Sequence, residues 1–163
     1  MKNKKHLPLY GVGPIYCVSI IAVSIIGIIL SKMGIFNDFK LFETKVVFII
    51  IGICIFLFGF WVWYKGAFKI DKYIKSNQLC TDGIYGLVRN PCYSGIMLMC
   101  TGALFIENNI ILLVLPPIYW LYMTVLMKNT EEKWLFDLYG KEYIDYCKNV
   151  NRCIPFPKRL FRK

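Results

Sequence analysis

A polar segment with an arginine stands directly before one of the hydrophobic stretches of this chain. It covers residues 83–95 and reads Gly-Ile-Tyr-Gly-Leu-Val-Arg-Asn-Pro-Cys-Tyr-Ser-Gly. An arginine at the edge of hydrocarbon is costly unless it binds an anion or a backbone carbonyl. Pro91 suits the first turn of a helix, and Tyr85, Arg89 and Tyr93 would converge beside that helix start, which favours negative charge. The alternative is that Arg89 only extends to lipid headgroups.

Two adjacent glutamates, Glu131 and Glu132, form a second candidate site after the last hydrophobic stretch. They begin a segment whose apolar residues recur at helical spacing, and Gly140 is expected to end that helix. A second short helix should follow. The alternative is a solvated face on which the glutamates pair with Lys128 or Lys133.

The elements that carry these residues are those of a membrane protein. The chain has 163 residues, of which 57% are hydrophobic, and this is too apolar for a soluble domain of its size. Four stretches lack charged side chains and are each long enough, at about 17 to 20 residues, to cross a bilayer. They are residues 12–30, 46–64, 90–106 and 108–127. The sequence predicts an all-α membrane protein with about four transmembrane helices, plus interfacial and C-terminal cytoplasmic helices.

Glycine and proline positions refine this prediction. The last two stretches should form a helical hairpin, because only a short turn at Glu107 separates them. Gly52 and Gly59 should let the second helix pack closely on a neighbour. Pro116 and Pro117 should kink the fourth helix or restart it.

The distribution of basic residues predicts that both termini are cytoplasmic. Five basic residues lie between the second and third stretches and nine follow the fourth, whereas three lie between the first and second. The net charge of +10 is concentrated beside the stretches and in an aromatic-containing tail, which suits anionic lipid headgroups and not nucleic acid. We therefore expect a multi-pass integral membrane protein that contacts anionic lipids.

The chain divides into two parts of different character. Residues 1–64 read as a two-span membrane anchor. Residues 65–163 hold the polar detail and comprise an interfacial segment, the helical hairpin and a C-terminal cytoplasmic cap.

The two polar segments together resemble a superfamily of integral-membrane methyltransferases, typified by isoprenylcysteine carboxyl methyltransferases and phospholipid N-methyltransferases. The family pattern is Gly-x-Tyr-x-x-x-Arg-His-Pro-x-Tyr-x-Gly, then Glu-Glu-x-x-Leu-x-x-x-(Phe/Tyr)-Gly-x-x-Tyr-x-x-Tyr, then a basic residue and Ile-Pro. The matching residues of this chain are Gly83, Tyr85, Arg89, Pro91, Tyr93, Gly95, Glu131, Glu132, Leu135, Tyr139, Gly140, Tyr143, Tyr146, Arg152, Ile154 and Pro155.

The resemblance implies that residues 65–163 are a methyltransferase core with a cytoplasm-facing pocket for S-adenosyl-L-methionine. The methyl acceptor would be a lipophilic small molecule or a lipidated substrate. Glu131 would pair with the ammonium of the methionine moiety, and tyrosine faces would lie near the sulfonium. The cofactor-binding residues carried over by position are Asn77, Gln78, Leu79, Cys80, Tyr85, Asn90, Pro91, Cys92, Tyr93 and Glu131.

Two positions depart from the family pattern. Asn90 replaces the family histidine and cannot shuttle a proton. We therefore expect a carboxylate or thiol acceptor and not an amine, which must first lose a proton. Met127 stands where prenylcysteine-type members hold the substrate carboxylate with an arginine, and the nearest cation is Lys128. Arg89 and Lys128 are thus the candidate catalytic residues for an anionic acceptor.

Two other functions fit parts of the pattern. A non-catalytic membrane scaffold or lipid-binding protein would explain both departures. An NADPH-dependent reductase of the sterol type carries a related Arg-His-Pro and Tyr signature, but it is expected to be far larger, and the Glu131–Glu132 pair favours methyl transfer.

Overall fold

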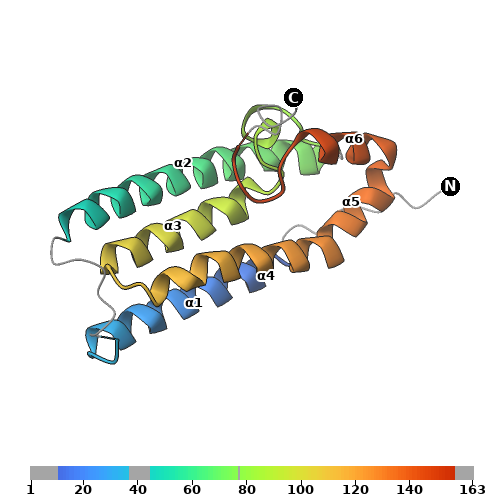
Figure 1. Ribbon diagram of the computed structural model, residues 1–163. Helices are drawn as coiled ribbons and strands as arrows, with labels where there is room; N and C mark the ends of the chain where they lie inside the picture. Colours follow the sequence, from blue (N-terminus) through green and yellow to red (C-terminus); the bar gives the residue numbers. More distant parts are fainter. Residues whose placement is uncertain (1–10, 37–44, 77, 157–163) are drawn as a thin grey trace.

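The computed structural model describes residues 11–36, 45–76 and 78–156, and in these ranges the regular structure is helical (Figure 1). The helices are α1 (Gly13–Lys32), α2 (Val46–Ser76), α3 (Pro91–Glu107), α4 (Leu115–Asn129), α5 (Glu131–Tyr139) and α6 (Lys141–Asn149), with short 3-10 turns η2 (Gly83–Gly86) and η3 (Leu112–Val114). The predicted all-α class is confirmed. The start of α1 and the end of α2 lie at the end of the molecule where α5 and α6 are found, opposite the turn between α3 and α4.

Within the described residues, two helices have the length and composition needed to cross a membrane. They are α1 and the Val46–Ile70 part of α2, with mean hydropathies of 2.4 and 2.8. The apolar helix α3 has 17 residues and α4 has 15, fewer than the roughly 20 that usually span a bilayer core. The structure therefore supports two of the four predicted spans by length.

The central helix α3 packs most extensively on α2, and the two run antiparallel. Their contact is made by glycines about two helical turns apart on each helix. A methyl group added at Gly102 would lie 2.5 Å from the carbonyl oxygen of Gly52, and one added at Gly95 would lie 2.7 Å from that of Gly59. The absence of side chains lets the backbones approach, so the predicted role of Gly52 and Gly59 is confirmed.

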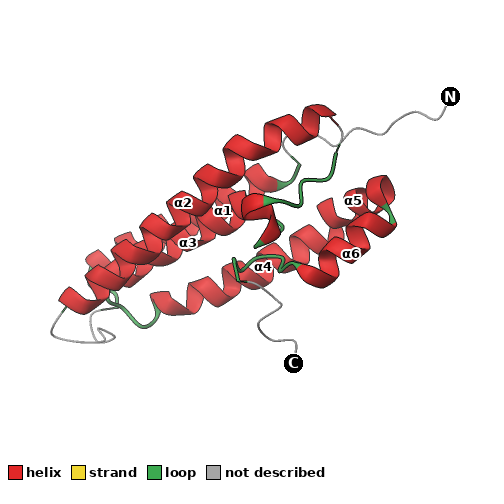
Figure 2. Cartoon of the chain, turned by 90° about the horizontal axis from the view of Figure 1, so that it is seen from above, coloured by secondary structure: helices red, strands yellow, loops and turns green. Residues whose placement is uncertain are grey.

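The turn between α3 and α4 reverses the chain, but α4 does not become the main partner of α3. Asn108 adopts the left-handed conformation with φ of 57°, and Asn109 donates from its amide to the carbonyl of Phe36 at 2.9 Å. Pro116 and Pro117 occupy the first turn of α4, so they restart the helix and do not kink it. Toward its C-terminal end α4 diverges from the other three long helices (Figure 2).

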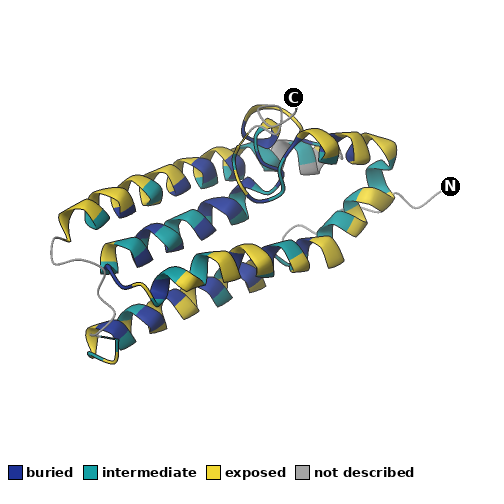
Figure 3. Cartoon of the chain, in the orientation of Figure 1, coloured by how far each residue is buried: buried dark blue, intermediate teal, exposed yellow. Residues whose placement is uncertain are grey.

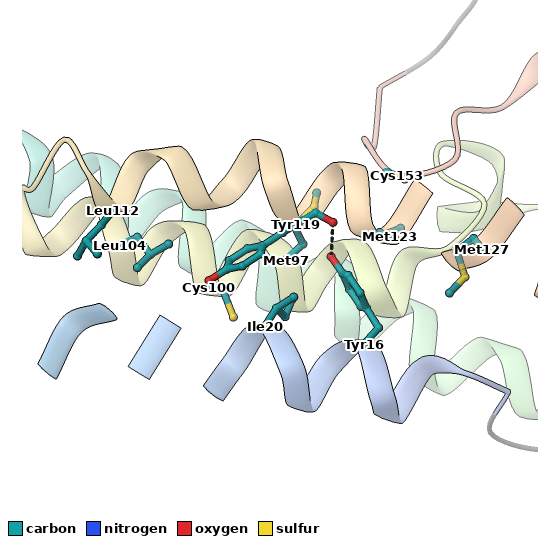
Figure 4. Packing of buried hydrophobic residues seen from close by; sticks show 10 residues of the cluster. All are labelled: Tyr16, Ile20, Met97, Cys100, Leu104, Leu112, Tyr119, Met123, Met127 and Cys153. Atoms are coloured by element: carbon teal, nitrogen blue, oxygen red, sulfur yellow. Dashed lines mark hydrogen bonds between the residues drawn. The ribbon is translucent and has the colours of Figure 1, made fainter. Parts of the chain in front are cut away.

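The largest cluster of buried apolar side chains lies between α1, α3 and α4 (Figure 4). Tyr16 crosses this core and donates to the carbonyl of Tyr119 at 3.2 Å, while the Tyr119 hydroxyl shares a hydrogen bond with Ser24 at 2.8 Å. The outer faces of α1 and α2 instead expose apolar side chains (Figure 3). Such an outer surface is suited to lipid.

Helix α2 continues without interruption from residue 46 to residue 76. The boundary expected at residue 64 therefore falls inside one helix. The first part of the expected interfacial segment is the C-terminal continuation of that helix.

We expect Gly102→Ala to lower the free energy of unfolding by about 1–3 kcal/mol through overpacking. Its methyl group would meet the Gly52 carbonyl and the backbone nitrogen of Phe56, which lies 2.7 Å away. Gly27→Ala is the matched control, because its methyl group would meet only side-chain carbons, at 3.0 and 3.7 Å. Both variants gain the same helix propensity. Thermal unfolding in detergent measures the difference, and equal melting temperatures would contradict close α2–α3 packing.

Candidate functional site

A cavity of about 380 Å³ lies where the start of α1, the end of α2 and the start of α3 face α5 and α6. Its volume is typical of small-molecule sites, which span about 300–1,000 Å³. Asn77, which is also predicted to bind the cofactor, lies outside the described residues. The other residues predicted to bind the cofactor all line the cavity: Gln78, Leu79, Cys80, Tyr85, Asn90, Pro91, Cys92, Tyr93 and Glu131.

Arg89 is buried, and its charge is matched inside the protein. Its Nη2 lies 3.1 Å from Oε1 of Glu132, and its Nη1 donates to the hydroxyl of Tyr143 at 3.3 Å and to Sγ of Cys147. The Tyr143 ring also lies 5.9 Å from the guanidinium carbon. Arg89 lines the cavity and is not extended toward lipid headgroups. Its Nε is buried without a hydrogen-bond partner among the described residues.

Glu132 joins Arg89 to a second arginine. Arg152 donates from Nε at 2.6 Å and from Nη2 at 2.9 Å to the two oxygens of this carboxylate, the bidentate geometry of strong ion pairs. The hydrogen bond to Glu132 raises the pKa of Arg152. Asn90 strengthens the same junction by donating from its amide to the carbonyl of Arg152 at 3.1 Å. The alternative of a solvated face does not apply to Glu132.

Glu131, the adjacent residue, faces the cavity. Its Oε1 accepts hydrogen bonds from the backbone N–H of Val12 at 3.0 Å and from the hydroxyl of Tyr93 at 2.8 Å. Burial raises the pKa of this carboxyl, although the hydrogen bonds from Tyr93 and Val12 act in the opposite direction. A carboxylate in such surroundings favours a cationic ligand, because a nearby positive charge stabilises its ionised form.

Aromatic side chains make up much of the remaining wall. The Tyr85 hydroxyl donates to the carbonyl of Gly66 at 3.4 Å, and the Tyr146 hydroxyl donates to the carbonyl of Tyr85 at 2.6 Å. These bonds fix two of the rings. The aromatic lining residues are Trp63, Tyr85, Tyr93, Trp134, Tyr139, Tyr143 and Tyr146. An aromatic wall with one carboxylate is suited to a positively charged group.

Asp82 follows the segment 78–80, which carries three of the lining residues. Its contacts with α2 hold this part of the chain against that helix. The Asp82 carboxylate accepts hydrogen bonds from Lys69 Nζ at 2.5 Å and from the Tyr73 hydroxyl at 2.9 Å. These bonds lower the pKa of Asp82. Burial raises the pKa of Cys80 to about 11, so its thiol is neutral near pH 7.

Lys128 does not line the cavity. It is exposed at the end of α4 and lines a different, more open hollow of about 440 Å³ together with Lys133 and Phe136. This hollow shares Tyr143 with the cavity wall. The preceding residue, Met127, is fully buried in the core between α1, α3 and α4. The position at which the family pattern places an arginine is therefore an apolar packing position in this chain.

No sequence motif predicted the part of the wall that comes from the start of α1 and from α2. Gly11, Gly13, Cys17, Trp63 and Ile70 line the cavity. All lie in the range predicted as membrane anchor or close to its boundary. The closely spaced glycines before Pro14 were the one available signal, because such a run allows close backbone approach.

Comparisons with known proteins point to one family. The family model described as phospholipid methyltransferase matches residues 42–142. Protein-S-isoprenylcysteine O-methyltransferase of Schizosaccharomyces pombe is 33% identical over 86 residues, which cover 52% of this chain and 36% of that protein. Protein-S-isoprenylcysteine O-methyltransferase B of Arabidopsis thaliana is 27% identical over 81 residues, or 49% of this chain and 41% of the relative. The matched stretch is thus less than half of each relative. No solved structure matches significantly.

The same substitution at the two glutamates should have different effects on the free energy of unfolding. We expect Glu132→Gln to lower the free energy of unfolding by about 3–5 kcal/mol, because Arg89 and Arg152 lose their buried partner. Glu131→Gln should leave stability unchanged or raise it at neutral pH. The raised pKa of Glu131 means that its contribution to stability is greatest below the unfolded pKa and is lost as pH rises through the folded pKa. Thermal unfolding in detergent measures both, and the reverse order would contradict the assigned contacts.

Proposed function

Because the chain belongs to the phospholipid methyltransferase family, we propose that it is an integral-membrane methyltransferase that uses S-adenosyl-L-methionine and acts on a lipophilic acceptor. The observation that carries this proposal is the aromatic cavity with Glu131 in its wall, lined by the nine described residues that the family resemblance assigns to the cofactor.

The residues present fit this cofactor, which when bound supplies a methyl group on a cationic sulfonium. Glu131 would bind the ammonium group through its carboxylate, and the faces of Tyr85 and Tyr93 would stabilise positive charge by about 0.5 to 2 kcal/mol. The buried Nε of Arg89 is a further donor that a ligand oxygen could satisfy. A carboxylate, aromatic faces and a guanidinium N–H would thus face the ammonium, the sulfonium and an oxygen of the cofactor.

The chain's own contribution is to hold two reactants in line and to exclude water. The ion pairs of Glu132 with Arg89 and Arg152 join the loop before α3 to the C-terminal segment and so hold the cavity together. Alignment of this kind can supply much of the lowering of the barrier. Asn90 contributes a hydrogen bond to the wall and no proton transfer. We infer that the acceptor is a carboxylate or thiol, which can react as an anion, and not an amine.

We further propose that α3 and α4 cross the bilayer together with α1 and α2, with both termini in the cytoplasm. In this arrangement the lipophilic acceptor enters between helices and the cofactor enters from the cytoplasm. The cavity is lined both by residues of the apolar helices, such as Cys17 and Trp63, and by residues of α5, such as Glu131. This lining supports entry of the lipophilic acceptor from the apolar helices and of the cofactor from the side of α5.

We expect the detergent-purified protein to bind S-adenosylhomocysteine, and Glu131→Gln to raise the Kd by about 10- to 100-fold through loss of a charge-assisted hydrogen bond. Glu142→Gln, which makes the same change at an exposed position of α6, is the matched control and should bind like the parent. Isothermal titration calorimetry measures the three affinities. Failure of the parent to bind would overturn the proposed function in favour of a scaffold, and binding of NADPH instead would favour the reductase.

The affinity for S-adenosylhomocysteine should rise with pH as Glu131 ionises, because only the carboxylate form pairs with an ammonium. Since burial raises the pKa of Glu131, the rise should be centred above the ordinary glutamate value of about 4.3. Calorimetry in two buffers of different ionisation enthalpy would detect the proton released on binding. In Glu131→Gln this proton release should disappear, and a pH-independent affinity in the parent would remove Glu131 from the site.

Incubation of methyl-labelled S-adenosyl-L-methionine with the protein and host membranes tests the acceptor class. We expect the label to enter a base-labile ester or a thioether. Label found in a lipid amine would contradict the inference drawn from Asn90.

A further inference from the structure

The residues that lead into α1 lie directly against the cavity wall. Residues 11–14, here called the N-terminal strap, contribute Gly11, Gly13 and Pro14 to the lining. Val12, between them, donates its backbone N–H to Oε1 of Glu131 at 3.0 Å. We propose that the N-terminal strap is a positioning element that orients the Glu131 carboxylate toward its ligand. This inference rests on the proposed function, because it concerns the same cofactor site.

The two glycines of the strap allow its backbone to touch the site. A methyl group at Gly11 would overlap Oε1 of Glu131, and one at Gly13 would overlap the ring and hydroxyl of Tyr93. Gly11 also has a φ of 47°, a conformation that L side chains rarely adopt. The strap is therefore shaped to lie on the two residues that form the polar part of the cavity.

The hydrogen bonds to Glu131 use one carboxylate oxygen and leave the other. The donors Val12 and Tyr93 both reach Oε1, and among the described residues none donates to Oε2. Two donors on one oxygen restrict rotation of the carboxylate, so that the second oxygen can accept from a ligand ammonium. Both bonds also favour the ionised form that such a ligand requires.

This role does not follow from the family match. The match covers residues 42–142 and so leaves out the strap. The donor is a backbone group, and any residue other than proline at position 12 retains its N–H. The strap is thus a contribution of the chain's amino-terminal part to a site otherwise assigned to its second half.

The pH dependence of binding reports on this contact. In the part of the chain that the structure describes, the titratable groups of other elements that interact with Glu131 are Tyr93 of α3 and Cys17 of α1. Both are neutral near pH 7, since their ordinary pKa values are about 10 and 8.5. Glu132 on the same helix is held by Arg89 and Arg152. A shift in the pH midpoint of binding therefore reflects Glu131 itself.

The test compares Val12→Pro with Val12→Ala in the full-length protein, with S-adenosylhomocysteine as the probe. Proline removes the N–H, and the Val12 φ of −94° is close to the proline range of about −65 ± 15°. We expect Val12→Pro to raise the Kd about tenfold near neutral pH and to move the pH midpoint of binding upward by about one unit. Val12→Ala retains the N–H, so its pH midpoint of binding should equal that of the parent.

An unshifted midpoint in folded Val12→Pro would overturn the proposal. Should that variant fail to fold, Gly11→Ala provides the second test, because its methyl group displaces the strap from Oε1 and should move the midpoint in the same direction. An unshifted midpoint in Gly11→Ala would likewise overturn it. Absence of binding in the parent is a different result, since it would reject the proposed function itself.

Discussion

The cavity depends on one carboxylate that holds two arginines. Glu132 binds Arg89, which stands at the start of α3, and Arg152, which follows α6. A buried arginine without this partner would be strongly destabilising, because its charge would lie uncompensated in a place that water does not reach. The C-terminal segment is therefore held against the loop before α3 and against α5, both of which line the cavity.

The adjacent position serves a different purpose. Glu131 has no basic partner among the described residues and accepts only neutral donors. Its burial opposes ionisation, so the ionised Glu131 side chain lowers the stability of the fold. The ion pairs of Glu132 act in the opposite sense, because they neutralise two arginines. Ligand sites typically contain buried charged groups that lack an opposite charge in the free protein. Such groups are retained because a bound ligand supplies that charge.

Much of this arrangement could be predicted from the sequence. The all-α class followed from long uncharged stretches, and nine cofactor-site residues that line the cavity followed from the family resemblance, whose glycine, arginine and tyrosine spacing is specific. The partners of Glu131 and Glu132 could not be predicted, because adjacent glutamates on a helix point about 100° apart and only the packing of α5 decides where each points. The contribution of Val12 was hidden for another reason, since a backbone donor leaves no trace in side-chain patterns. Lys128 was assigned to the site because it is the cation nearest to the position of the family arginine, and its role in binding the acceptor stays a prediction.

In the proposed membrane arrangement, the length of α2 sets the position of the site relative to the lipid. Its 31 residues extend over roughly 46 Å at about 1.5 Å per residue, whereas the hydrocarbon core measures about 30 Å. The helix thus exceeds that thickness by about three turns, and Ile70 of the cavity wall is the last residue of its apolar part. Because α2 contributes to the cavity wall, its length sets the depth of the cavity in the proposed arrangement. Adding or removing one turn would move the cavity by about 5.4 Å along the bilayer normal, and under the proposed function this would change which part of a lipophilic acceptor reaches the cofactor.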